Sequence, residues 1–316
     1  MRTLILTIAA CLVPETLRAQ VPEIHGPFSG VVFDHASRSL RPLLGVPGAA
    51  YLAQPLLAAV DLASVAPNGT LALIIQENGV ELVRNLDLTP QHIPLKDLAG
   101  LPDQALWAPD SSTVVVYSAA GQCLQRLRGL TEAPLAESPV DLSSIGGPVR
   151  LLAADRQARR ILFSSDRAVY LVVETGPAAL LAHIENPALA AFTSDGQDLY
   201  VAGASQWLEI RHRSGGDTVL PFTEDSLFRP AALALSEDDR LLYAAGRSPH
   251  LVRVYDRATR SLLTEIPLEQ EPSALQRLPR PGLYHLGSRK PGEPLWLFQA
   301  GPQAAVYFVP VREEGK

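Results

Sequence analysis

A polar turn between two short apolar segments recurs along the chain, and this repeat constrains the fold more than any other feature. The intervals between the second residues of successive turns are 42, 45, 40, 43 and 42 residues. A fixed period in this range is typical of architectures in which one supersecondary unit is reused. The second turn residue falls at Asn68, Asp110, Asp155, Asp195, Asp238 and Arg280, with the copies at Asp155 and Arg280 the loosest.

The residues of the repeat explain its structure. Asp and Asn side chains hydrogen-bond to the backbone just ahead of them, and Gly accepts a positive φ, so both suit tight links between antiparallel strands. The flanks, such as residues 71–75, 113–117 and 199–201, are short and rich in β-branched or aromatic residues, which predicts strands. Some are apolar throughout, as expected of strands buried on both faces.

A second pair of strands follows the first, most clearly at residues 251–255 and 261–266. Four short strands in about 42 residues is the pattern of one propeller blade. No helical spacing is sustained at a competing length. The sequence therefore predicts an all-β fold, a β-propeller of four-stranded antiparallel blades in a single domain.

The number of blades depends on the start of the chain. Residues 32–40 mirror residues 254–262, which predicts that residues 31–44 form the outer hairpin of a blade whose inner strands are missing upstream. Residues 28–60 then form an irregular seventh blade, or strands at 294–300 and 304–311 supply the missing inner pair. Both closures join the N- and C-terminal strands and leave no free sheet edge. Seven blades are favoured, with six as the alternative.

Residues 1–19 have the pattern of an export signal, with Arg2, an apolar run over residues 4–13 and a small residue, Ala19, before the expected cleavage point. The run is too short to span a bilayer. We expect an exported, periplasmic or extracellular propeller over residues 20–316, ordered from about 28 to 311. The alternative is a lipoprotein anchored through Cys11, because residues 8–11 resemble a bacterial lipoprotein box.

Charge and cysteine content exclude several classes of function. The formal net charge is −6, only three of the 27 basic residues are lysines, and no basic stripe occurs, so we expect no nucleic-acid partner. The pair Arg159–Arg160 is expected at a solvated strand end. If the signal is removed, Cys123 is the only cysteine left, and it is expected to be a small packed hydrophobe. We expect a monomer without a transmembrane segment.

No catalytic, metal or cofactor motif stands out. The chain lacks a P-loop, a dinucleotide fingerprint and a complete serine-hydrolase elbow. The turn residues Asp110, Asp195 and Asp238 recur at the blade period and are therefore interpreted as structural. The histidines are scattered without a paired metal motif. They are His25, His35, His92, His183, His212, His250 and His285.

Residues 194–202 (SDGQDLYVA) and 254–259 (VYDRAT) resemble the YVTN/lactonase-type bacterial β-propellers. The resemblance covers about residues 28–311, with two blades matching well and the others in outline. It implies blade construction and carries no activity, because members of the family include binding propellers and a sugar-lactone hydrolase. No site residue is carried over from it.

Three functions remain open. The first is a non-enzymatic scaffold that binds a ligand or protein on one propeller face. The second is a lactonase-type hydrolase at the channel mouth, for which the candidates are His92, His183, Arg229 and Arg247. The third is a structural module of an envelope assembly. The connectors 87–105 and 129–148 are expected around that mouth, where loops tend to carry function. Ionisable side chains converging there would favour the enzyme, whereas Ala, Leu and Pro would argue against it.

Overall fold

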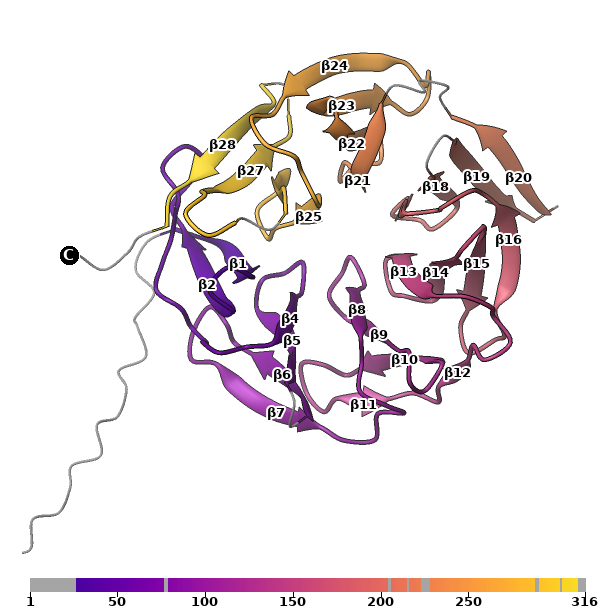
Figure 1. The fold of residues 1–316 in the computed structure, drawn as a ribbon, viewed down its shortest axis with the longest axis horizontal. Helices are drawn as coiled ribbons and strands as arrows, with labels where there is room; N and C mark the ends of the chain where they lie inside the picture. Colours follow the sequence, from indigo (N-terminus) through magenta and orange to yellow (C-terminus); the bar gives the residue numbers. More distant parts are fainter. Residues whose placement is uncertain are drawn as a thin grey trace, which may run out of the picture.

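The computed structural model describes residues 27–311, except 77–78, 204–205, 215, 223–227, 288–289 and 302. In these residues the strands form seven antiparallel sheets arranged radially around a channel (Figure 1). The predicted all-β propeller and its seven blades are confirmed. No described segment is a helix of the length and hydropathy that a membrane span requires. The expected signal peptide with its Cys11 alternative and the tail after Val311 lie outside the described residues.

Five blades are four-stranded meanders in which each strand pairs with the next in sequence. Blades are numbered from 1 to 7 in chain order. Blade 2 consists of β4 (Leu62–Val65), β5 (Leu71–Gln76), β6 (Gly79–Arg84) and β7 (Gln91–Leu95). Blade 4 consists of β13 (Val149–Ala154), β14 (Arg160–Ser165), β15 (Ala168–Val173) and β16 (Ala179–His183), and blade 5 of β17 (Leu189–Phe192), β18 (Asp198–Ala202), β19 (Trp207–Arg213) and β20 (Gly216–Pro221). Blade 6 consists of β21 (Arg229–Leu235), β22 (Leu241–Ser248), β23 (His250–Asp256) and β24 (Leu262–Pro267), and blade 7 of β25 (Gln276–Arg277), β26 (Leu283–His285), β27 (Leu295–Gln299) and β28 (Ala305–Val309).

Blade 3 has a divided outer strand, because two short segments both pair with its third strand. The prediction that residues 87–105 and 129–148 are simple connectors between blades is therefore wrong, because each range contains outer-strand segments. These are β7 in the first range and β11 and β12 in the second. An outer strand has one exposed edge and exposed side chains, so its sequence lacks the apolar run that marks the inner strands. The strands of blade 3 are β8 (Gln104–Trp107), β9 (Val114–Ser118), β10 (Cys123–Arg128), β11 (Leu135–Ala136) and β12 (Val140–Asp141).

Blade 1 is the irregular seventh blade expected from residues 28–60. It has three strands, β1 (Phe28–Asp34), β2 (Ser39–Leu44) and β3 (Tyr51–Leu52), in that order. The C-terminal strands β27 and β28 belong to blade 7 and supply no inner pair. The prediction that residues 31–44 form the outer hairpin is wrong, because β3 pairs with β2 on its outer side.

The two ends of the described chain meet between blades 1 and 7. The Leu52 N–H donates to the Pro310 carbonyl oxygen at 3.0 Å, and Leu52 forms a parallel bridge with Val311. Val32 and Leu43 of blade 1 share one apolar cluster with strands of blade 7. A cluster of this kind lies at each of the seven junctions between neighbouring blades in the described part of the chain. The core is thus a ring of interblade wedges.

The recurring turn residues hold the first hairpin of each blade. The Oδ1 atoms of Asp110, Asp195 and Asp238 accept backbone N–H bonds from the second residue ahead, at 2.9, 2.9 and 3.1 Å. Asn68 Oδ1 accepts from Thr70 N–H at 3.0 Å in the same way. The structural interpretation of these aspartates is confirmed.

Arginine side chains also join neighbouring blades. Arg126 is 1% exposed, and its Nε donates to the Ala158 carbonyl oxygen in the turn of the next blade at 2.7 Å. Arg160, expected at a solvated strand end, instead donates from Nη1 to the Gly196 carbonyl oxygen at 2.6 Å. These guanidinium groups therefore fix each turn to the adjacent sheet, which positions the strands that line the channel.

Candidate functional site

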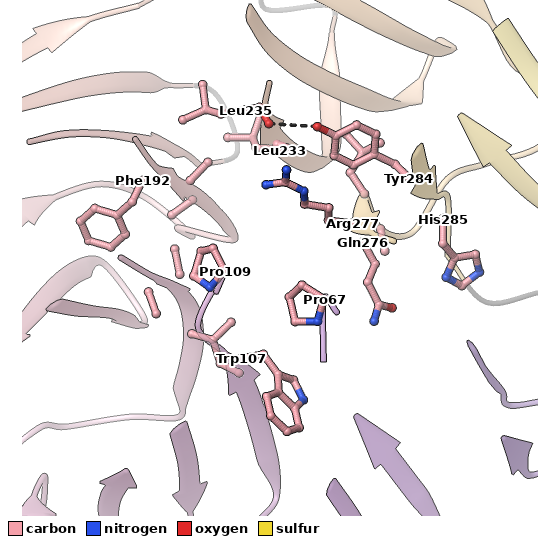
Figure 2. A pocket seen from close by; sticks show the side chains of 18 of the residues that line it. Pro67, Trp107, Pro109, Phe192, Leu233, Leu235, Gln276, Arg277, Tyr284 and His285 are labelled. Carbon is pink, nitrogen blue, oxygen red and sulfur yellow. Dashed lines mark hydrogen bonds between the residues drawn. The ribbon is translucent and has the colours of Figure 1, made fainter. Parts of the chain in front are cut away.

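The inner strands enclose a channel cavity of about 560 Å³ (Figure 2). This volume lies in the usual range of small-molecule sites. Small residues on converging strands, such as Ala190, Ala191 and Ala234, leave this space open near the axis. Most other wall residues are apolar or aromatic, including Phe33, Pro67, Trp107, Phe192 and Leu233.

The charged groups at one mouth of the cavity are paired with one another. This mouth, here called the turn mouth, is formed by the first turns of the blades. Arg277 Nη2 lies 2.5 Å from Glu237 Oε1. Asp239 Oδ2 accepts hydrogen bonds from the Ser194 N–H at 2.8 Å and from its hydroxyl at 2.5 Å. The hydroxyl of Tyr284 donates to the carbonyl oxygen of Leu235 at 3.0 Å, drawn as a dashed line in Figure 2.

Blade 1 interrupts the regular lining of the channel. A Cβ added at Gly30, near the start of β1, would lie 2.9 Å from Pro279 Cδ in the first turn of blade 7. β1 therefore starts at the turn mouth and runs away from it, as the second strand of every other blade does. No strand of the described residues occupies the first-strand position of blade 1. At the turn mouth the two neighbouring blades meet across this position, because Gln276 Nε2 of blade 7 lies 3.4 Å from the Val65 carbonyl oxygen of blade 2.

Further from the turn mouth, five cavity-lining residues lie on blade 1 or in the neighbouring blade 7 and the segment leading to it, and we call them the blade-1 recess: Phe33, His35, Ser273, Gln276 and His285. The ring centroids of Phe33 and His35 lie 4.5 Å apart in an edge-to-face contact. Figure 2 shows His285 and Gln276 on the same side of the cavity. They are cross-strand partners on β26 and β25.

His285 is 5% exposed, and neither ring nitrogen has a hydrogen-bond partner of normal geometry among the described residues. Burial lowers the pKa of His285 to about 4, while the Gly287 backbone opposes this shift. The nearby His35 lowers the pKa further and Asp34 raises it. The imidazole is therefore neutral at neutral pH, with one donor nitrogen and one acceptor nitrogen.

The four residues expected at a hydrolase site do not converge. His92 and His183 lie on the outer strands β7 and β16, and His92 Nδ1 is hydrogen-bonded to Glu81 at 2.8 Å. Arg247 pairs with Glu271 at 2.9 Å, and Arg229 is exposed at the start of β21. None of the four lines the cavity. The expectation that these residues gather at the channel mouth is wrong, because His92 and His183 belong to outer strands and Arg229 and Arg247 lie outside the cavity lining.

The sequence did not single out His35, Arg277 or His285 as cavity residues. The available signal was weak: His285 interrupts the apolar run of residues 283–286, and an ionisable residue in a buried strand needs a reason. In the described part of the chain, no group of three His, Cys, Asp or Glu residues could hold a metal ion. Cys123 is buried in β10, and burial followed by the charge of Asp141 raises the pKa of its thiol, so the packed-hydrophobe interpretation is confirmed.

Sequence comparison finds no matching family model and no similar curated protein. Solved structures of similar fold include a Lactobacillus plantarum protein, with a TM-score of 0.65, 16% identity, and coverage of 90% of this chain and 96% of that one. A Bacteroides fragilis protein named as a candidate 6-phosphogluconolactonase has a TM-score of 0.61, 13% identity, and coverage of 89% and 92%. A Bacteroides uniformis protein named in the same way has a TM-score of 0.61, 12% identity, and coverage of 90% and 96%. At these identities the likeness shows the propeller fold alone.

Proposed function

We propose that this protein is a non-enzymatic binding propeller that takes a small, mainly apolar ligand into its central channel. The observation that carries the proposal is the cavity of about 560 Å³, whose wall combines many Ala, Leu, Val, Pro and aromatic residues with nearly as much exposed polar as apolar surface. A concave apolar wall with a few polar groups is typical of small-molecule sites. Displacing water from such a wall supplies the main binding free energy, at about 25 cal/mol per Å² of apolar surface buried.

The polar groups of the cavity argue for binding over catalysis. A general base needs a free lone pair and a pKa near the working pH. Glu237 is held in an ion pair with Arg277, and one oxygen of Asp239 accepts two hydrogen bonds from Ser194, so both carboxylates already have roles in the turn mouth. His285 has a free acceptor nitrogen, but its lowered pKa makes it a weak base at neutral pH.

The alternative is a lactonase-type hydrolase of the YVTN/lactonase kind. It is favoured by the names of two structural neighbours and by the turn sequences that resemble that family. A phosphorylated lactone fits the cavity poorly, however. Among its lining residues Arg277 is the only arginine or lysine, it is already paired with Glu237, and Asp239 adds a second carboxylate. A phosphate dianion would meet net negative charge there.

The binding proposal is tested with N-phenyl-1-naphthylamine, an uncharged apolar dye whose fluorescence rises in apolar surroundings. We expect saturable binding of one dye per chain. Ala234→Phe, which fills the channel wall, is expected to weaken binding at least tenfold, whereas Ala179→Phe on the exposed outer strand β16 leaves it unchanged. Equal binding by both variants would place the dye outside the channel and refute the proposal.

The hydrolase alternative is tested in parallel with 6-phosphogluconolactone and glucono-1,5-lactone as substrates. We expect rates equal to the spontaneous hydrolysis in buffer for the wild type. A rate above the buffer value that Ala234→Phe abolishes would favour the hydrolase over the binding propeller.

We also infer that the chain is exported, on the pattern of residues 1–19, and that it is a monomer without a nucleic-acid partner, the latter on the absence of a basic stripe. Mass spectrometry of the exported product is expected to give a chain that begins at Gln20. A mass that corresponds to an acylated Cys11 would instead establish the lipoprotein alternative. Light scattering of the purified protein measures whether the chain is monomeric.

A further inference from the structure

Blade 1 gives the channel one side that differs from the other blades. In the six other blades the first strand stands between the second strand and the axis. In blade 1 no described strand does so, and the end of β1 with Phe33 and His35 borders the cavity directly. His285 of blade 7 lines the same part of the cavity.

His285 is the side chain in this recess whose hydrogen-bonding atoms could bind a ligand. The Gly287 backbone acts on the ring as a hydrogen-bonding group, but neither buried nitrogen has a partner of normal geometry among the described residues. Because an incompletely paired buried polar group costs about 1–3 kcal/mol, the fold itself gains little from this imidazole. Gln276, its cross-strand partner, donates from Nε2 to the Val65 carbonyl oxygen, and its Oε1 accepts no hydrogen bond from the described residues. The two side chains together offer a donor and two acceptors on one side of the cavity.

The charges around the recess decide which polar group fits. Asp34 is 3% exposed, accepts from the Ala36 N–H at 3.1 Å and from the Ser37 hydroxyl at 2.6 Å, and lies 3.8 Å from Arg41. It is therefore occupied and offers no counter-ion to a cationic ligand. An anionic ligand would lie near this carboxylate, and no arginine or lysine is among the recess residues to compensate for the lost hydration, which is costly.

We propose that the blade-1 recess is a ligand subsite that binds an uncharged hydroxyl- or carbonyl-bearing group through His285 and Gln276, while the apolar part of the same ligand lies along the channel. This proposal rests on the binding function proposed above and assigns its polar anchor. It places recognition at one side of the ring, on the residues of the blade-1 recess.

The probe is phenyl β-D-glucoside, an uncharged molecule with one apolar ring and several hydroxyl groups, and phenyl phosphate is its anionic counterpart. Binding is measured by isothermal titration calorimetry at pH 7.5. The variants are His285→Phe, which removes the hydrogen-bonding nitrogens, and His285→Gln, which keeps a neutral donor and acceptor. His183→Phe on the outer strand β16 is the matched control.

We expect the wild type and His183→Phe to bind phenyl β-D-glucoside equally and at least tenfold more tightly than phenyl phosphate. His285→Phe is expected to lose at least tenfold in affinity for the glucoside, and His285→Gln to recover part of that loss. His285→Phe is also expected to melt at or above the wild-type temperature, because an unpaired buried polar group has been removed.

Three results would overturn the assignment. Failure of the wild type to bind the glucoside refutes the uncharged class of ligand, and equal binding by His285→Phe and the wild type refutes the subsite. A melting temperature of His285→Phe several degrees below the wild type, without rescue of binding by His285→Gln, would make His285 a structural residue. In each case the naphthylamine titration reports independently whether the channel itself binds, so failure of the subsite and failure of the binding function are distinguishable.

Discussion

The strongest single prediction concerns the stability of the protein in mild acid, and the perturbation is the change His285→Phe. Burial holds the pKa of His285 at about 4 in the folded protein, against 6.5 for an unperturbed histidine. Between these values the unfolded chain binds a proton that the folded chain does not bind. Stability from this group is therefore complete above pH 6.5, is lost as the pH falls toward 4, and does not change further below 4.

The magnitude follows from the two pKa values. Each pKa unit of difference corresponds to 1.36 kcal/mol, so this one group accounts for a loss of about 2 kcal/mol between pH 7.5 and pH 5 and about 3 kcal/mol by pH 4. The nearby His35 and Asp34 contribute to the shift and remain in the variant. Subtracting the curve of His285→Phe from that of the wild type therefore isolates the contribution of His285.

The assay is urea unfolding followed by tryptophan fluorescence at half-unit steps from pH 4 to pH 7.5, for the wild type, His285→Phe and the control His183→Phe. We expect the wild type and the control to lose stability in parallel, and His285→Phe to lose about 3 kcal/mol less over this range. Curves for His285→Phe and the wild type that run parallel at all pH values would refute the reasoning, because they would mean that His285 titrates alike in the folded and unfolded states.

Three further predictions concern the packing of the ring. Arg126→Ala is expected to lower the free energy of unfolding by about 3 kcal/mol in urea titrations, because it leaves buried carbonyl oxygens of the next blade without a donor. Gly69→Ala is expected to lower the free energy of unfolding by about 2 kcal/mol more than Gly196→Ala. Both glycines have φ near +70°, but only a Cβ at position 69 would lie 2.5 Å from Pro279 Cγ of blade 7. Equal losses would contradict a contact between blades 2 and 7. Cys123 is expected to resist 5,5′-dithiobis(2-nitrobenzoic acid) at pH 8 until urea unfolds the chain, because the buried thiol has a raised pKa; rapid labelling of the native protein would refute its burial.

The propeller could be predicted from the sequence because the turn residues recur at the period of one blade. Asp110, Asp195 and Asp238 occupy the same place in three of the blades. Each accepts a hydrogen bond from the backbone N–H two residues ahead, and this local contact favours an aspartate there. Inner strands such as β5 and β9 are buried on both faces, so their apolar runs were equally plain. These features depend on neighbours in sequence, which a single chain displays directly.

The outer strands and the site could not be predicted in the same way. The outer strand β20 is exposed along most of its length, so burial imposes no apolar pattern on it. The contact between Gln276 and Val65 joins residues 211 positions apart and exists only because the ring closes. The same is true of His285, whose surroundings are set by blade 1 at the other end of the chain. A periodicity argument reports what the blades share, whereas these contacts depend on where they differ.

That difference bears on how a symmetric ring acquires a specific site. Seven equivalent blades would present a similar wall to the axis from every side, which gives an apolar ligand no preferred orientation. In this chain the self-match of residues 32–40 with residues 254–262 disguised the break in symmetry, because a hairpin sequence alone does not say which two strands of a blade it forms. The direction of β1 shows which strand it is. β1 starts at the turn mouth and runs away from it, as a second strand does, whereas a first strand runs toward the turn mouth. Within the described residues, blade 1 therefore gives the channel a side that differs from the other six, and a ligand anchored at His285, as proposed above, would be oriented by that side.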